Sequence, residues 1–140
     1  MDYARNVDEA IDLIREFNVH FIHAPQHVMI ADSSGQFRVI EYIEGKLRIT
    51  PAQQAWQICT NHLVWNKSEK ENDNLCRRYR IASGAVEQGG GKIDALDVCD
   101  ITRSMCQPIT MWTSLYNLTT REACIIYRSE LDCRYYDRLQ

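Results

Sequence analysis

Several absences narrow what this sequence of 140 residues can be. No two cysteines are spaced Cys-x-x-Cys, so neither a zinc knuckle nor a redox pair is expected. No apolar run approaches the roughly 20 residues that span a bilayer, and residues 1–6 lack the hydrophobic stretch of a secretory signal. Basic residues are scattered at a net charge of −3, which does not suit a nucleic-acid partner. We therefore expect a cytoplasmic protein that binds neither membrane nor nucleic acid.

Cofactor and metal motifs are also missing. His20, His23 and His27 lie close together, but Pro25 breaks any regular spacing and no nearby carboxylate completes a ligand set. The triple glycine at 89–91 lacks the spacing of a phosphate loop and reads as a linker. We expect neither a metal nor a cofactor. The six cysteines fall mostly inside apolar patterns and are expected to be reduced thiols.

The composition is that of an ordinary globular protein. It is 45% apolar and 25% charged, and its length suits a single domain covering residues 1–140.

A β meander over residues 27–49 is the strongest pattern in the chain. An apolar run ends in Asp-Ser-Ser-Gly at 32–35, which has turn chemistry. A β-branched and aromatic run follows to Ile43, and Glu44-Gly45 makes a second tight turn into a short third strand that Pro51 ends. Residues 56–60 are predicted as a further strand.

Helices flank this meander on both sides in the sequence. Residues 6–17 form a predicted helix with Asn6 as its N-cap and Glu9 three residues later. Its apolar stripe is Ala10, Leu13, Ile14 and Phe17.

The second half of the chain repeats the mixture of helices and strands. Residues 66–74 are polar and are predicted as an exposed loop. Helices are predicted over 75–88 and 93–105, and a β-hairpin over 109–128. Hairpin connections dominate, so the fold class is α+β with a largely antiparallel sheet and packed helices.

The order of the meander motifs resembles one enzyme group. Ala-Asp-Ser-Ser-Gly at 31–35, the apolar run with Glu41, and Thr60-Asn61 resemble the choloylglycine hydrolase and penicillin V acylase family of linear-amide hydrolases. The likeness extends from about residue 7 to about residue 128 and matches only the later part of such an enzyme. It implies part of the αββα layered fold of the N-terminal nucleophile hydrolases.

Two residues carry the site that the resemblance implies. In that family the Thr-Asn asparagine donates to the tetrahedral oxyanion, a role that falls on Asn61 here. An arginine opening the next helix falls on Arg78, where its charge favours a thiolate. The alternatives are a turn bond for Asn61 and a solvated helix face for Arg78.

The attacking residue of that family has no counterpart here. It is a cysteine at the mature amino terminus, whereas residue 2 is aspartate. Self-cleavage before Cys59 would destroy the strand predicted there, and Cys76, Cys99 and Cys124 are expected to be buried small side chains.

Two hypotheses on function follow. In the first, the chain is the carboxy-terminal portion of a linear-amide C–N hydrolase acting on an N-acyl amide, and a second chain or a missing amino-terminal half supplies the nucleophile. In the second, it is a non-catalytic domain that binds a partner or forms a homodimer to cover its open sheet faces.

Overall fold

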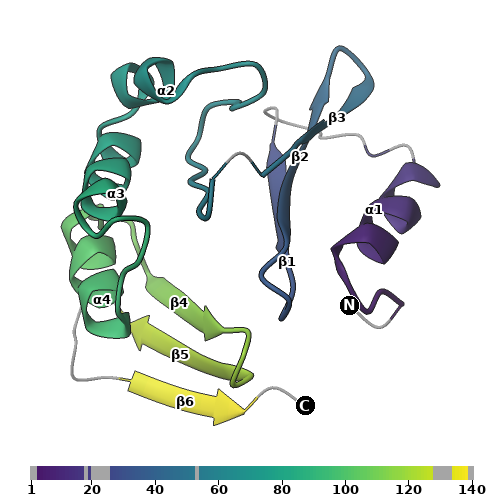
Figure 1. Cartoon of the computed structure of the whole chain (residues 1–140). Coiled ribbons are helices and arrows are strands. Elements are labelled where there is room, and N and C mark those ends of the chain that lie inside the picture. Colours follow the sequence, from purple (N-terminus) through teal and green to yellow (C-terminus); the bar gives the residue numbers. More distant parts are fainter. Residues whose placement is uncertain (1–2, 18, 20–25, 53, 128–133, 139–140) are drawn as a thin grey trace. The chain divides into compact units, whose positions relative to one another are not determined.

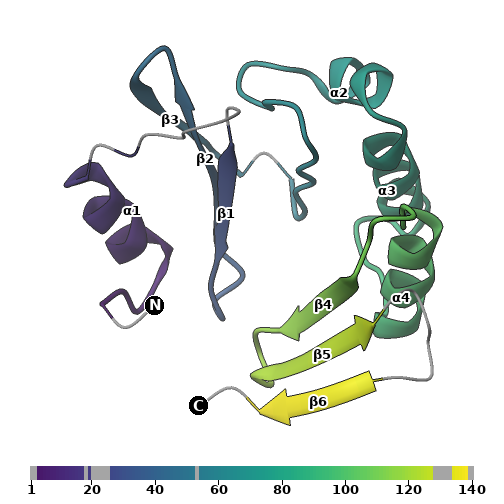
Figure 2. The same cartoon turned by 180° about the vertical axis from the view of Figure 1, so that it is seen from behind.

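The computed structural model, shown from opposite sides in Figures 1 and 2, divides into two compact units, Met1–Ser83 and Gly84–Gln140. The sequence predicts a single domain over residues 1–140, and the division into two units does not test that prediction. The structure describes residues 3–17, 19, 26–52, 54–127 and 134–138.

The first unit combines an antiparallel sheet with helices on either side of it in the sequence. Among its described residues the elements are α1 (Val7–Arg15), β1 (His27–Ala31), β2 (Phe37–Ile43), β3 (Lys46–Thr50), α2 (Glu69–Leu75) and the beginning of α3 (Arg77–Gln88).

The meander predicted from the sequence is confirmed. β2 is the central strand and pairs antiparallel with β1 and β3. Gly35 closes the first turn at φ 83°, and Glu44 and Gly45 take φ values of 53° and 72° in the second. Positive φ at both central positions matches the twist of paired strands. β3 ends at Thr50, directly before Pro51, which lacks the N–H a further pair would need.

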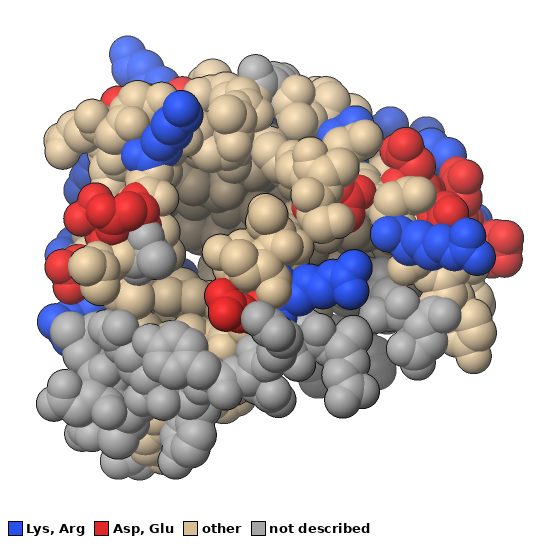
Figure 3. Space-filling model, turned by 60° about the horizontal axis from the view of Figure 1, so that its bottom comes forward, with Lys and Arg blue, Asp and Glu red and all other residues tan. Residues whose placement is uncertain are grey.

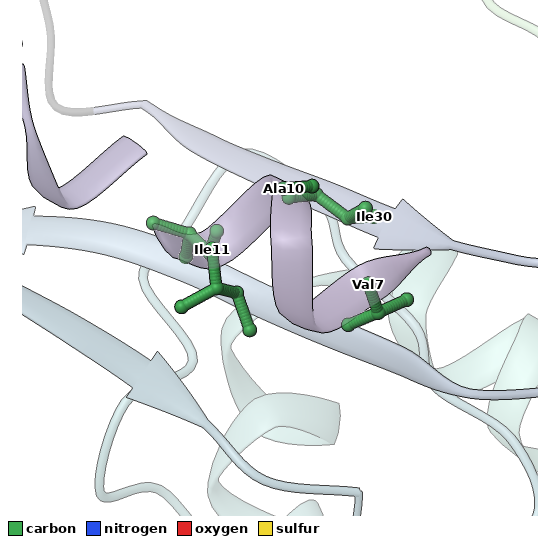
Figure 4. Close-up of a cluster of buried hydrophobic side chains, with 5 residues drawn as sticks. Val7, Ala10, Ile11 and Ile30 are labelled. Atoms are coloured by element: carbon green, nitrogen blue, oxygen red, sulfur yellow. The ribbon is translucent and has the colours of Figure 1, made fainter. Parts of the chain in front are cut away.

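Helix α1 packs on one face of this sheet. Asn6 caps it as predicted, because its side chain accepts the Glu9 N–H at 2.9 Å. Phe17 was predicted on the buried stripe and is 64% exposed, since the helix ends two residues earlier. The buried cluster between helix and sheet, drawn in Figure 4, consists of Val7, Ala10, Ile11, Ile30 and Ile40.

Asp32 ties the amino end of α1 to the β1–β2 turn. Its carboxylate accepts the Ser34 hydroxyl at 2.5 Å and the Val7 N–H at 2.9 Å. The hydrogen bonds from Ser34 and Val7 hold the pKa of the Asp32 carboxyl below its usual 3.8. The turn motif therefore also fixes where the helix begins on the sheet.

The opposite face of the sheet is covered by a segment without helix or strand, residues 54–67. Val39 and Glu41 point to this face, because side chains alternate along β2, and both are 0% exposed. The strand predicted at 56–60 is wrong. Two N–H groups further along the segment bond the Glu41 side chain instead of a strand edge.

Helix α2 corrects a second prediction, since residues 66–74 were assigned to an exposed loop. Ser68 and Glu71 form a capping box, in which each side chain accepts the backbone N–H of the other residue. This box stabilises a short polar helix that lacks an apolar stripe. Apolar periodicity, on which the prediction depended, could not reveal it.

The second unit holds the rest of α3, helix α4 and a second antiparallel sheet. Gly90 and Gly91 have φ of 62° and 81°, and the Gly91 N–H bonds the Val86 carbonyl at 2.9 Å, so the glycines end α3 as predicted. The predicted hairpin is confirmed as β4–β5. The described elements are α4 (Ala95–Ser104), β4 (Trp112–Asn117), β5 (Glu122–Tyr127) and β6 (Arg134–Arg138), in sheet order β4–β5–β6.

The fold class is α+β with antiparallel sheets, as the sequence predicts. The αββα layering stays a prediction. In the described part of the chain, no helix has the length and apolar character needed to span a membrane. On the face drawn in Figure 3, acidic and basic side chains lie interspersed.

Candidate functional site

A buried carboxyl group anchors the segment that carries Asn61. Glu41 Oε1 accepts the Val64 N–H and Glu41 Oε2 accepts the Trp65 N–H, each at 2.8 Å. His27 Nδ1, on the neighbouring strand, lies 3.5 Å from Glu41 Oε1. Burying a carboxyl group costs free energy unless hydrogen-bond donors surround it, and the Val64 and Trp65 N–H groups are such donors.

A chain of hydrogen bonds connects the same segment to α2. His62 Nε2 lies 2.9 Å from Asn72 Oδ1, and His62 Nδ1 lies 3.0 Å from the Thr60 hydroxyl. Because Asn72 Oδ1 only accepts, His62 Nε2 is the donor in that contact. Asn72 is 3% exposed, so this polar contact is made away from solvent.

Tyr79, on the first turns of α3, completes the buried part of the site. It is 2% exposed, and its ring lies 5.8 Å from the His62 ring, centroid to centroid. Burial raises the pKa of the Tyr79 hydroxyl above its usual 10, while a hydrogen bond with the Asn72 side chain acts in the opposite direction. Residues from the segment, α2 and α3 therefore share one polar cluster.

Cys76 lies between α2 and α3, where the Arg80 N–H bonds its carbonyl at 3.1 Å. Burial by itself raises the pKa of the Cys76 thiol. Hydrogen bonds with the Thr60 side chain and with the backbone N–H groups of Tyr79 and Arg78, together with the Arg78 charge, bring the net pKa below its usual 9.0. The half-buried thiol has polar neighbours and is not the small apolar core residue expected from the sequence.

The structure brings together the two segments that carry the predicted site residues. Asn61 stands between Thr60 and His62, and Arg78 stands two residues after Cys76; the Thr60–Cys76 hydrogen bond joins these segments. The Asn61 side chain is exposed and that of Arg78 is half-buried. Among the described residues, no side chain or backbone group hydrogen-bonds the Asn61 amide, and no carboxylate pairs with Arg78.

A cavity of about 500 Å³ adjoins this cluster within the first unit. Asn72 and Tyr79 line it, as do the two Trp side chains of the covering segment, Trp56 and Trp65. The Arg48 guanidinium lies 5.6 Å from the centroid of the Trp65 ring, on the side of β3. Neither Asn61 nor Arg78 lines the cavity. The other lining residues are Thr50, Pro51, Gln54, Gln57, Val64, Asn66, Lys67, Ser68 and Glu69.

The Cys59 thiol is not activated. Burial, with a contribution from the Glu41 charge, raises the pKa of Cys59 to about 12. A thiol with that pKa is protonated at neutral pH and does not attack a carbonyl. Cys99 is buried, as the sequence predicts, and Cys124 is half-buried.

The histidine cluster considered for metal binding lies mostly outside the described residues, which include neither His20 nor His23. His27 faces Glu41. Within the described ranges, no three His, Cys, Asp or Glu side chains are grouped so as to hold a metal ion.

Chemically, the arrangement offers a free amide donor, an unpaired guanidinium and a cavity lined by aromatic and amide groups. Among the described residues, no base is seen beside an exposed nucleophile. Sequence reasoning placed Glu41 in the family motif without a structural role, and it missed His62 and Asn72 as parts of this region. Ser68-x-x-Glu71 was the one local signal that could have placed Asn72 on a helix.

Comparison with known proteins places the first part of the chain in a family. The model of the family described as "Acyl-coenzyme A:6-aminopenicillanic acid acyl-transferase" matches residues 1–80, which include both Asn61 and Arg78. The likeness expected as far as residue 128 is thus found over a shorter range. None of the curated proteins and none of the solved structures compared with the chain matches it.

Proposed function

The chain belongs to the acyl-coenzyme A:6-aminopenicillanic acid acyl-transferase family, and from this premise we propose that it forms the oxyanion-binding wall of an N-acyl amide hydrolase or acyl-transferase. The family is one of the choloylglycine hydrolase and penicillin acylase group, as the sequence motifs predict. The observation that carries the proposal is the junction of the Asn61 and Arg78 segments beside a cavity.

Asn61 is proposed as the oxyanion donor. A side-chain amide that has no partner within the described protein and is open to solvent is available to a developing negative charge. Such a donor stabilises the tetrahedral intermediate more than the planar ground state, because the oxygen becomes charged only there.

Arg78 is proposed to set the charge of the reacting sulfur. Its positive charge already acts on one thiol, that of Cys76. A cysteine supplied beside it would be favoured as the thiolate for the same reason.

The cavity is proposed to hold the acyl part of the substrate. Aromatic walls from Trp56, Trp65 and Tyr79 suit an apolar group, and Asn72 and Gln57 provide amide groups for orientation. In the reaction that the family implies, the sulfur attacks the amide carbonyl, the amine leaves with a proton, and water or a second amine releases the acyl group from the thioester.

The nucleophile is proposed to come from a partner, either a missing amino-terminal half or a second chain. Two thiols of the described residues are unsuited to this role: Cys59 is protonated, and the Cys76 thiol is bonded to Thr60 and to the start of α3. We therefore expect no turnover by this chain alone.

The test is to co-express the chain with an amino-terminal half that begins Met-Cys and to assay the purified complex on penicillin V, a glycine-conjugated bile acid and an N-acyl homoserine lactone. Hydrolysis of one of them is expected, and Asn61→Ala should lower kcat by roughly 10²–10³. Asn74→Ala, an exposed asparagine on α2, is the matched control. Arg78→Ala is compared with Arg80→Ala, which is exposed on the same helix. Equal rates for Asn61→Ala and Asn74→Ala would reject the assignment.

One observation favours the non-catalytic alternative. On one face of β4–β5, the side chains of Trp112, Tyr116 and Ile125 are 63%, 59% and 40% exposed. Such a surface suits a second copy of the chain or a partner domain. A sedimentation experiment on the wild type and on Trp112→Ser tests it, since self-association through this face should weaken in the variant.

A further inference from the structure

Glu41 stands where the sequence pattern calls for an apolar side chain. It lies at the centre of β2, between Ile40 and Tyr42, and is 0% exposed. An aliphatic residue at this position would bury apolar surface without the cost of desolvating a carboxyl group. The carboxyl group therefore does something that an aliphatic side chain does not.

What it does is visible in its partners. Both oxygens accept backbone N–H groups of successive residues, Val64 and Trp65, at 2.8 Å each. The segment that contains them forms no strand, so these N–H groups have no ladder partner. Hydrogen bonds to a buried carboxylate are among the strongest in proteins. Glu41 thus accepts the two N–H groups that a neighbouring strand would accept in a sheet.

The two residues that donate these N–H groups border the cavity and follow Asn61 closely in the sequence. Val64 and Trp65 form one wall of the cavity. Asn61 lies three residues earlier, and His62 between them is held from the other side by Asn72. The exposed Asn61 amide is therefore carried on a short segment anchored at two points, one on the sheet and one on α2.

We infer that Glu41 is a positioning residue, which holds the Asn61 segment and the Trp65 wall of the cavity against the sheet through two backbone hydrogen bonds. The inference that Glu41 holds the cavity wall applies to this chain by itself. The part that concerns Asn61 as an oxyanion donor rests on the proposed function.

Site-resolved amide hydrogen exchange on the full chain tests this inference without any substrate. In the wild type, the Val64 and Trp65 amides should exchange as slowly as amides of β2. They should exchange much more slowly than those of residues 56–58, whose N–H groups do not bond Glu41. In Glu41→Gln, one oxygen is replaced by an NH₂ group that faces a donor. Exchange at Val64 and Trp65 should then accelerate roughly 10- to 100-fold.

Two control variants separate local positioning from general destabilisation. Glu16→Gln removes an exposed carboxyl group after α1 and should leave exchange at Val64 and Trp65 unchanged. Val7→Ala thins the core on the opposite face of the sheet and should accelerate the slow amides of β2, Val64 and Trp65 alike. Glu41→Gln should accelerate the two segment amides more than those of β2.

Two results overturn the inference. One is exchange at Val64 and Trp65 in the wild type as fast as at residues 56–58, a measurement that does not depend on any variant folding. The other is a Glu41→Gln effect that is equal at β2 and at the segment. Loss of the proposed function would leave the exchange result standing, because exchange is measured without turnover.

Discussion

The two faces of the β1–β3 sheet are equally buried at the centre, but the contacts that cover them differ in kind. Ile40 is 1% exposed on the face under α1, and its neighbour Glu41 is 0% exposed on the other. The first face is covered by an amphipathic helix through aliphatic contacts. The second is covered by an irregular segment through hydrogen bonds to a carboxyl group.

The two kinds of contact have different effects: apolar contacts stabilise the fold, whereas hydrogen bonds to a carboxyl group fix the position of the backbone. Apolar contacts are non-directional, and a helix can shift on them at small cost. Two short hydrogen bonds to one carboxyl group fix the two N–H groups that donate them at particular positions. The candidate site lies on the second face, where a loop must be held in one shape and regular secondary structure does not hold it.

The largest effect is expected on the aliphatic face. Ile40→Ala should lower the free energy of unfolding by about 2–5 kcal/mol, because it removes buried surface and leaves a cavity. Urea denaturation measures it. Val28→Ala is the control, since Val28 pairs with Ile40 on the same face but is 41% exposed. A loss below about 1 kcal/mol for Ile40→Ala would mean that this face is not the stabilising one.

The next effect distinguishes the second face from the first. Glu41→Leu should lower the free energy of unfolding by about 1–3 kcal/mol, because two buried N–H groups lose their acceptors while the added apolar burial offsets part of the cost. If Leu at position 41 stabilised the chain, the two faces would be interchangeable and the comparison would fail.

A smaller effect is expected at the thiols beside the second face. Thr60→Val removes a hydrogen bond that lowers the pKa of Cys76, so that pKa should rise and the thiolate fraction at pH 7.5 should fall. Alkylation of Cys76 by iodoacetamide, followed by mass spectrometry, should slow roughly three- to tenfold at that pH.

Cys59 provides an internal reference in the same measurement. With its pKa raised to about 12, it should react only when the chain unfolds. Thr119→Val, at an exposed turn of the second unit, is the matched control. A Cys76 rate that is the same in Thr60→Val and in the wild type would contradict the bond.

The smallest effect is expected on the stability at acidic pH, through Asp32 beside the amino end of α1. The folded pKa of Asp32 is below its usual 3.8, so its contribution to stability is complete at neutral pH and is lost as the pH falls through the folded pKa. Asp32→Asn should therefore reduce the decline in stability below about pH 4, measured as urea midpoints from pH 7 to pH 2.5. Asp12→Asn, on the exposed side of α1, is the control.

Local signals predicted the first face almost completely. The cap at Asn6, the helical stripe of α1 and the turn residues Asp32 and Gly35 act over a few positions of sequence. The cap and the turn residues were predicted in their correct places. The stripe was misread at Phe17, where the pattern continues beyond the end of the helix, and it left out Val7 and Ile11, which are buried.

The second face could not be predicted in the same way. The stretch at 56–60 has the composition of a strand, yet it pairs with none of the described strands. The bonds that hold the following residues run to Glu41, more than 20 positions earlier. A contact of that separation leaves no periodic trace in the sequence. Asn61 and Arg78 were found through the resemblance, and no local pattern indicates that their segments meet.

The sequence by itself determined the fold class, the β1–β3 meander, the capped helix on it and the family, because all of these depend on neighbouring residues or on ordered motifs. Only the tertiary structure decided that Glu41 acts as a backbone partner, that His62 and Asn72 join the covering segment to α2, and that a cavity lies between them. Those features depend on groups that burial brings together, where a hydrogen bond or a charge acts over a few ångströms whatever the distance along the chain.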